Sequence, residues 1–411
     1  MHSGEISLLL TSGTERDRLE PCAGPRHATR SCVSGRGLGY HVAVSTSANL
    51  ANTAEASEST AASASRAAPA DKSYIVGPIY DWVFFLAPPT FALALGILIS
   101  GTSFAESQFT LFDETVTLSA VLIGIFIHAH LVIVFVRSHG NPDIFQTHPV
   151  RFVAVPLGLY VAMLSSQWIF VSVSVLATFW DVYHSGAQTF GFARIYDRRA
   201  GNPPEIGRRL DFWLNQLLYA GPILAGAVML DHFEDFGEFS DIESPAAAFF
   251  TAVPVYMEGH QGYFTWAVLA GGTAFLVYYL MSYVRLQRAG YQVSMQKVYL
   301  LVTTGFCSIY TWGFNSWGEA FFIMNFFHAL QYFGLVWSSE KRSLMRLLRV
   351  ADSRLGPALA LTAMLVFGFA YGVAAELGVG NAEHLLALTL VVSIMHFWYD
   401  GFIWSVRRKQ V

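Results

Sequence analysis

Long apolar stretches recur along the chain from about residue 80 onward, separated by short polar or charged segments. A stretch of about 20 apolar residues can cross the hydrocarbon core of a bilayer as a helix. The pattern predicts ten helices, near residues 80–101, 114–137, 151–166, 168–193, 211–230, 263–284, 297–314, 317–338, 357–377 and 384–406. Pro88 and Pro89 predict a kink in the first. We therefore expect an all-α, polytopic integral membrane helix bundle.

The first 73 residues have a different composition. Residues 45–73 are rich in Ala, Ser and Thr and contain very few large apolar side chains. Such a segment buries too little surface to offset the entropy lost on ordering. The sequence thus predicts a disordered low-complexity tail over residues 1–73 and a single transmembrane helical domain over residues 74–411.

The basic residues orient the predicted helices. With both termini in the cytoplasm, 18 of the 25 Lys and Arg residues lie in or beside cytoplasmic loops or the C-terminal tail, and the other seven lie in the N-terminal tail. The external segment Asp231–Glu258 carries seven acidic residues and no basic one. Positive charge accumulates in this way on the cytoplasmic side of membrane proteins. We expect a multi-pass protein of a bacterial inner membrane with both termini in the cytoplasm.

Composition narrows the possible functions. Only 13% of the residues are charged and the net charge is −4, so the chain lacks the clustered basic surface of a nucleic-acid-binding protein. The three cysteines, Cys22, Cys32 and Cys307, form neither a CxxC pair nor a disulfide framework. We expect the chemistry to depend on other side chains.

Ionisable and amide side chains interrupt four of the predicted helices, all of which run from the outside to the cytoplasm. Such residues are costly inside a membrane span and usually mark a functional site, a helix–helix bond or a water pathway. In chain order they are His128 and His130; Asp181, His184 and Gln188; Asn325, His328 and Gln331; and His396 and Asp400.

The histidines of these four helices lie at one predicted depth. Each helix has a histidine nine to thirteen residues before its first cytoplasmic Lys or Arg. At 1.5 Å per residue, this is roughly 14–20 Å from the cytoplasmic boundary. His128 and His130 are about 200° apart on a regular helix, so we expect only one of them to face the layer that His184, His328 and His396 form.

The companions of the histidines favour a metal site. His396 and Asp400 are one helical turn apart, which lets the carboxylate ligate beside the imidazole or orient it. Imidazole and carboxylate ligands suit iron, zinc, manganese or copper. The candidate metal ligands are His128, His130, His184, His328, His396 and Asp400. The candidate catalytic residues are Asp181, Gln188, Asn325 and Gln331.

The cytoplasmic loop after the second helix adds His139 and His148. They lie nine residues apart, across a turn that contains Gly140 and Pro142. They could cap the site from the cytoplasmic side, although ordinary polar loop residues are the simpler interpretation.

Aromatic residues are dense near the histidines, as at Phe179–Trp180, Phe326–Phe327 and Phe397–Tyr399. A pocket with this lining suits a lipid, an isoprenoid or another hydrophobic small molecule better than a small ion. The favoured hypothesis is a membrane oxidoreductase of the hydroxylase, desaturase or oxygenase type. Its cofactor would be non-haem iron, and its partners would be the lipid bilayer and an electron-donor protein.

Two alternatives use the same residues. A transporter would relay protons or bind a substrate through them, and helix breaks are then expected at matching positions in two halves. Gly186 in the fourth helix has no counterpart in the eighth. An electron-transfer protein would bind haem between histidine pairs, and two pairs at different depths are expected, whereas the sequence predicts one layer.

Overall fold

The computed structural model describes residues 70–99, 101–103, 107–111, 114–226, 260–315, 317–378 and 383–404. All of them belong to one compact unit, Ala67–Val411. The predicted disordered tail, apart from its last four residues, the acidic segment Asp231–Glu258 and the C-terminal tail lie outside the described residues.

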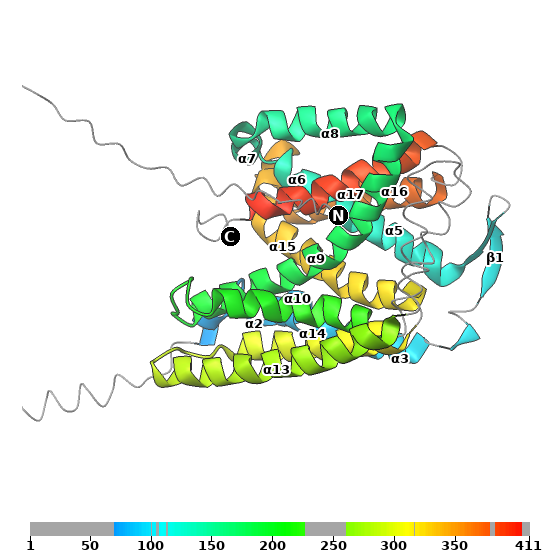
Figure 1. Cartoon of the computed structure of the whole chain (residues 1–411). Helices are drawn as coiled ribbons and strands as arrows, with labels where there is room; N and C mark the ends of the chain where they lie inside the picture. Colours follow the sequence, from blue (N-terminus) through cyan, green and yellow to red (C-terminus); the bar gives the residue numbers. More distant parts are fainter. Residues whose placement is uncertain are drawn as a thin grey trace, which may run out of the picture. The chain divides into compact units, whose positions relative to one another are not determined.

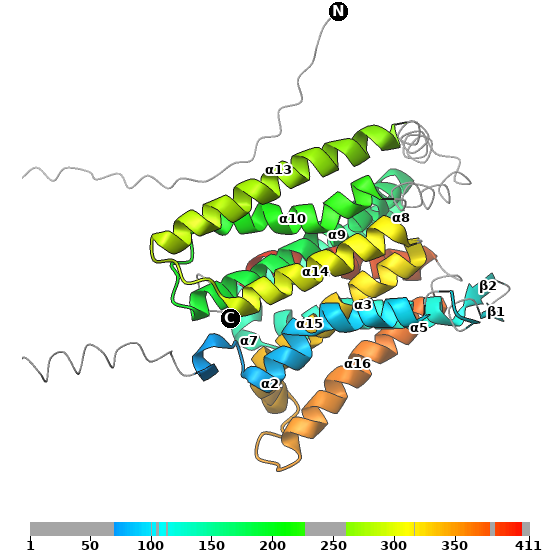
Figure 2. The ribbon, with the colours of Figure 1, turned by 90° about the horizontal axis from the view of Figure 1, so that it is seen from below.

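Helices make up most of the described chain, so the all-α prediction is confirmed (Figures 1 and 2). They are η2 (Ala70–Ser73), α2 (Pro78–Asp81), η3 (Trp82–Leu86), α3 (Pro88–Ile99), α5 (Leu118–Val132), α6 (Val134–Ser138), α7 (Pro142–Thr147), α8 (Pro149–Ser165), α9 (Gln167–Arg199), α10 (Arg208–Ala225), α13 (Gln261–Arg288), α14 (Met295–Phe314), α15 (Trp317–Leu347), α16 (Gly356–Gly378) and α17 (Glu383–Ile403). Each of the ten predicted segments overlaps one of these helices or, for the first, the series α2–η3–α3.

Two helix boundaries follow directly from local sequence. The segments Pro78–Leu86 and Pro88–Ile99 are inclined by 47° to each other. Pro88 and Pro89 lack backbone N–H groups and their rings crowd the preceding turn, so the predicted kink is confirmed. α8 ends at Ser165, and the hydroxyl of Ser166 accepts a hydrogen bond from the Ile169 N–H at the start of α9.

Among the described residues, a β-hairpin interrupts the helical pattern. Strand β1 (Gln108–Leu111) pairs antiparallel with β2 (Glu114–Thr117), with Gln108 opposite Thr117. The prediction of a helix from residue 114 is therefore wrong for its first four residues. Thr115, Val116 and Thr117 are β-branched, and such residues favour extended backbone.

Four of the described segments are long and apolar enough to cross a membrane: Val121–Ser138, Gln261–Arg288, Gly356–Gly378 and His384–Ile403. The bent pair Pro78–Leu86 and Pro88–Ile99 would add a fifth if it forms a single crossing. These segments are compatible with an integral membrane protein.

Helices α9 and α15 lie between two groups of helices. On one side they share an apolar core with α5, α6, α8, α16 and α17, to which Val171 and Tyr332 belong. On the other side α9 packs with α10, α13 and α14 around Leu214 and Leu301. Figure 1 shows α8 and α17 on one side of α9, and α13 and α14 on the other. The polar faces of α9 and α15 are consequently turned towards the interior.

Helix α16 packs closely against α5 through small residues. A Cβ atom on Gly372 would collide with the backbone carbonyl of Ile125, and one on Gly368 would lie 3.2 Å from the Ala129 carbonyl oxygen. Small residues let membrane helices approach in this way. On α5, a Cβ on Gly124 would collide with the carboxylate of Glu376. These contacts fix which face of α5 is turned towards α16.

Candidate metal centre

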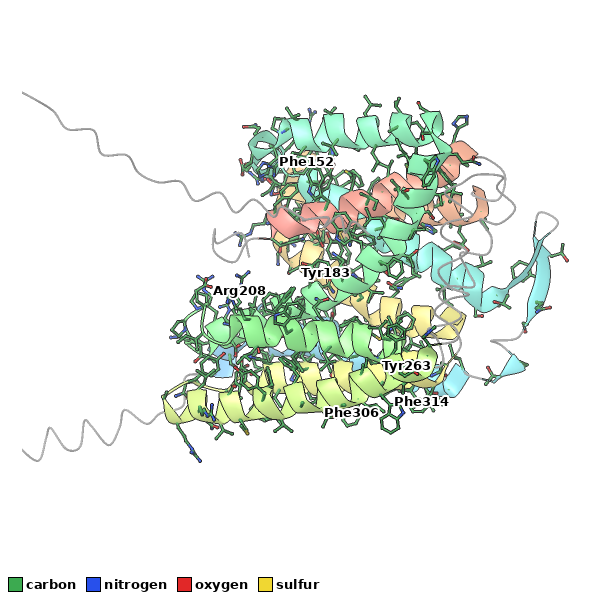
Figure 3. All side chains as sticks on the ribbon, in the orientation of Figure 1. Phe152, Tyr183, Arg208, Tyr263, Phe306 and Phe314 are labelled. Carbon is green, nitrogen blue, oxygen red and sulfur yellow. The ribbon has the colours of Figure 1, made fainter. Side chains whose placement is uncertain are left out.

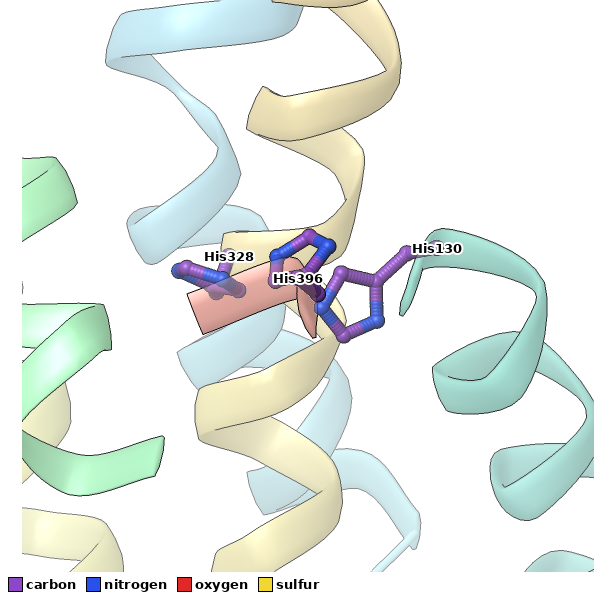
Figure 4. A group of neighbouring side chains, drawn as sticks. All are labelled: His130, His328 and His396. Atoms are coloured by element: carbon purple, nitrogen blue, oxygen red, sulfur yellow. The ribbon is translucent and has the colours of Figure 1, made fainter. Parts of the chain in front are cut away.

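Four imidazoles from four helices meet in the interior. His130 comes from α5, His184 from α9, His328 from α15 and His396 from α17, and none is more than 5% exposed. Successive ring centroids are 5.3 Å apart from His130 to His328, 5.1 Å from His328 to His184, 4.9 Å from His184 to His396 and 5.0 Å from His396 to His130. The four rings therefore form a closed cycle, which we call the histidine cluster. Figure 4 shows three of its members.

Some ring nitrogens of the cluster are bonded within the protein and others are available to a cation. Nδ1 of His396 lies 3.0 Å from the Leu131 carbonyl oxygen and donates to it, so Nε2 of that ring carries the lone pair. This Nε2 is 3.2 Å from Nε2 of His184. Within the described chain, neither nitrogen of His328 or of His130 has a hydrogen bond of normal geometry, although the Ile127 carbonyl lies near the His130 ring.

Asp400 adds a carboxylate to one side of the cluster. Its Oδ2 lies 3.7 Å from Nε2 of His184 and 3.9 Å from Nε2 of His396. Its Oδ1 accepts two hydrogen bonds, from the Tyr332 hydroxyl and from the Trp404 indole N–H, each at 2.8 Å. The two donors hold the carboxylate so that the second oxygen faces the imidazoles.

Two overlapping sets of ligand atoms have the spacing of a metal site. One set is His130, His328 and His396, and the other is His184, His396 and Asp400; the ligand atoms within each set lie within 4.8 Å of one another. His396 belongs to both sets, and its Nδ1 is already bonded to the backbone. Since only its Nε2 can ligate, the arrangement suits a single ion better than two.

His128 lies apart from the cluster. Its Nδ1 donates to the Gly124 carbonyl at 2.9 Å and is 3.4 Å from the carboxylate of Glu376 on α16. The reason is the angle between residues two apart on a helix: with His130 turned inward, His128 faces α16. Of the six candidate ligands, the structure thus brings together His130, His184, His328, His396 and Asp400.

The two candidate glutamines join helices rather than imidazole rings. Gln188 donates to the His328 backbone carbonyl at 3.1 Å and to the Gln331 side-chain oxygen at 3.2 Å. Gln331 in turn donates to the Phe85 carbonyl at 2.9 Å. This chain of bonds connects α9, α15 and η3 and holds the backbone beside His328.

Asp181 and Asn325, the other two catalytic candidates, interact with each other through their side chains. Each lies three residues before the cluster histidine of its own helix, so the pair lies about one turn closer to the predicted external side.

The loop histidines are held by local contacts. Nε2 of His139 lies 3.2 Å from the Phe152 carbonyl oxygen and its Nδ1 lies 2.9 Å from the Ser138 hydroxyl. Burial lowers the pKa of His139, which keeps the ring neutral near pH 7. His148 packs edge-on against Phe402, with centroids 5.0 Å apart. Neither belongs to the ligand sets described above.

A second buried polar cluster lies on the other side of α9, and sequence reasoning missed it. It consists of Arg194, Asp197, Asp211 and Lys297, which we call the charge network. Oδ2 of Asp211 is 2.6 Å from Arg194 Nη1 and 2.7 Å from Lys297 Nζ, and Oδ2 of Asp197 is 2.7 Å from the same two nitrogens. The phenols of Tyr279 and Tyr283 donate to Oδ1 of Asp211.

The charge network adds to the charge pattern. Arg194 and Lys297, which are among the 18 basic residues counted on the predicted cytoplasmic side, are only 7% and 2% exposed because they pair with buried carboxylates. The same holds for Arg137 on α6, which pairs with the buried Glu340. Asp211 and Glu340, which pair with Arg194 and Arg137, come from other helices, so this pairing could not be read along a single segment.

No family model, no characterised protein and no solved structure matches this chain. The chemistry of the site therefore has to be inferred from its own geometry.

Proposed function

We propose that the chain is a membrane-embedded, metal-dependent redox enzyme in which the histidine cluster and Asp400 hold one non-haem iron ion. The observation that carries this proposal is the closed cycle of four buried imidazoles with a carboxylate positioned at its side. A buried polar group without a partner costs free energy, and a cation at the cluster would engage the lone pairs of the rings in either ligand set, with His396 common to both.

The donor set suits iron. Neutral imidazole and carboxylate ligands bind iron, zinc and copper, whereas thiolate would favour softer metals. Cys307, the cysteine among the described residues, lies on α14, where its sulfur is 3.8 Å from the Thr311 hydroxyl, and not in the ligand sets. Iron would supply the capacity to activate dioxygen, and the substrate would be a hydrophobic lipid or an isoprenoid taken from the bilayer.

Haem is a poorer occupant of this site. A porphyrin extends on all sides of its iron and has to separate its two axial ligands. Nε2 of His184 and Nε2 of His396 are only 3.2 Å apart, and the His130 and His328 rings fill the adjoining positions. A bare ion fits among four contacting rings, and a macrocycle does not.

Ten crossings with both termini in the cytoplasm are part of the proposal. Some helices are not apolar enough along their whole length to be recognised as membrane spans, and α14 is an example. Its polar side chains lie on the inner face of the helix. On α14, Lys297, Thr304, Ser308 and Thr311 are buried. Its exposed large residues are all apolar: Met295, Val298, Val302, Phe306, Ile309 and Phe314. Figure 3 labels Phe306 and Phe314 on this outer side. An apolar outside around a polar inside is expected of a helix that faces lipid.

Metal analysis and an optical spectrum of the detergent-purified protein test the proposal. We expect about one iron per chain without a Soret band, consistent with a single site. His184→Ala should lose the metal, and His128→Ala, on a histidine outside the cluster, should retain it. A Soret band would favour haem. Protein that takes up no metal on reconstitution would contradict the proposal and favour transport.

A further inference from the structure

The last two turns of α15 and the loop that leads to α16, together residues 341–355, carry a concentration of exposed positive charge. We call this segment the basic turn. Its five cations are Lys341, Arg342, Arg346, Arg349 and Arg354, all exposed, and its one acid is Asp352. None of the five takes part in an ion pair among the described residues. The charge is therefore available to a partner.

Exposed leucines are interleaved with these cations. Leu347 is 59% exposed, Leu348 39% and Leu355 66%. In a helix that simply leaves the membrane, the exposed apolar residues end where the charged residues begin. Here they resume after Lys341 and Arg342. A segment with both features lies in the membrane interface, with its apolar side chains below the headgroups and its charges among them.

The backbone of the basic turn is strained at a charged residue. Arg349 has φ of 57°, and it is the only residue other than glycine with a positive φ in the described chain. The Val350 N–H donates to the Met345 carbonyl at 2.9 Å, which closes the end of α15 in the manner that usually places glycine at this position. An arginine there keeps a guanidinium at the tip of the turn despite the unfavourable conformation.

We propose that the basic turn binds the headgroups of acidic phospholipids in the cytoplasmic leaflet. Leu347 and Leu355 would insert among the upper acyl chains, and the guanidinium groups would contact the phosphates. Arginine suits this role because its planar donors match phosphate oxygens two at a time. The proposal requires that the chain spans the membrane, but it is independent of the metal.

A general excess of cytoplasmic charge does not account for these features. The turn from α13 to α14 also exposes two cations, Arg285 and Arg288. Its exposed large apolar side chains, Val284 at 47% and Met295 at 71%, lie outside the stretch from Arg285 to Arg288. Both turns follow the positive-inside pattern, and the basic turn differs in placing exposed leucines among its cations, as Leu347 and Leu348 lie between Arg346 and Arg349. The α13–α14 turn is therefore a matched control.

The test is a lipid titration of the detergent-purified full chain with phosphatidylglycerol and with phosphatidylcholine of the same acyl chains, followed by native mass spectrometry. The chain should prefer phosphatidylglycerol. Since each basic residue near a surface contributes about fivefold to the affinity for anionic lipid, Arg346→Gln with Arg349→Gln should weaken phosphatidylglycerol binding about 25-fold. Arg285→Gln with Arg288→Gln should leave it close to that of the unmodified chain.

Two further measurements distinguish the contribution of the acyl chains to binding from that of the headgroup charge. Leu347→Ser with Leu355→Ser keeps every cation and should still weaken phosphatidylglycerol binding. Inorganic phosphate, which has no acyl chain, should not displace the lipid at equal concentration. An equal loss in the Arg285 and Arg288 variant, no loss in the Arg346 and Arg349 variant, no loss in the leucine variant, or displacement by inorganic phosphate would each overturn the proposal.

Discussion

The histidine cluster and the charge network are both buried, both polar and both attached to α9, yet they differ in completeness. In the charge network, two cations face two carboxylates, and both oxygens of Asp211 are engaged; Arg194 Nε and Asp197 Oδ1 are its atoms without a hydrogen bond. In the histidine cluster, four rings face one another, and neither nitrogen of His328 has a hydrogen-bond partner among the described residues. The first arrangement is stable as it is, and the second gains most from an added cation.

The two clusters illustrate two roles of buried polar groups in a membrane protein, which are to connect helices and to bind a ligand. Opposite charges that neutralise each other connect helices, here α9, α10 and α14. In the histidine cluster, one hydrogen bond between rings, from His184 to His396 at 3.2 Å, is found among the described residues, and the rings of His130 and His328 contribute no such bond there. Their convergence is explained by a ligand that all of them can bind. Substitutions can test whether the two clusters are as different as their geometry indicates.

The largest expected effect is on metal binding by His328→Leu. The loss of one ligand should weaken metal affinity by more than the roughly 10–100-fold that removal of an outer partner costs. Because the His328 nitrogens have no hydrogen-bond partner in the part of the chain that the structure describes, an apolar side chain of similar size should leave the metal-free protein about as stable as before. Metal titration and thermal unfolding of the metal-free protein measure the two effects. A clear loss of stability would show that the ring has a structural role of its own.

Lys297→Met should have the opposite profile. Removing one cation leaves a buried carboxylate uncompensated, which costs about 3–5 kcal/mol. We expect a large drop in thermal stability in detergent and normal metal content in the protein that remains folded. Arg288→Met, on an exposed cation of α13, should change stability by no more than about 0.5 kcal/mol. Normal melting of the Lys297 variant would remove the distinction between the two clusters.

Tyr332→Phe should weaken metal binding without removing a ligand. It deletes one of the two donors to Oδ1 of Asp400, and the loss of such a partner typically costs about 10–100-fold in metal affinity. Tyr183→Phe, on an exposed tyrosine of α9, is the control and should bind metal normally. If both variants bind equally well, Asp400 does not need Tyr332 to orient it.

Gly372→Ala should have the smallest effect and should reach the cluster indirectly. The added methyl group would collide with the Ile125 carbonyl on α5, and overpacking of this kind costs about 1–3 kcal/mol. Since His130 is on the same helix, metal affinity should fall with stability. Gly271→Ala, where no atom lies within 4 Å of the new Cβ, should not destabilise the protein. An unchanged affinity in Gly372→Ala would mean that α5 is positioned by other contacts.

The sequence predicted the helices well because the signal for each lies within one contiguous segment, a run of apolar residues with charged residues at its ends. It also predicted that one histidine from each of four helices lies at a common depth, and the structure brings those four together. Depth follows from counting residues along a single helix, so no knowledge of the neighbouring helices was needed.

What the sequence could not supply depends on rotation and on distant partners. Tyr332 and Trp404 lie four residues after His328 and Asp400, a spacing that could have drawn attention to them, but aromatic residues are too common in this chain to stand out. Gln188 and Gln331 were assigned to catalysis because they lie in the same predicted spans as the cluster histidines. Their bonds to backbone carbonyls depend on how the helices pack. The carboxylates that bind Lys297, those of Asp211 and Asp197, lie 86 and 100 residues away in the sequence.

The contact between α5 and α16 bears on how the site could change. Helix α5 carries two histidines, His128 and His130, and one of them lies in the histidine cluster. Glycines of α16 pack against one face of α5, which turns His128 towards α16 and His130 towards the cluster. The identity of a ligand is thus encoded at a distance from the ligand. A rotation of α5 by roughly half a turn would exchange His130 for His128 without altering either residue, so this interface is where a variant with different metal geometry could arise.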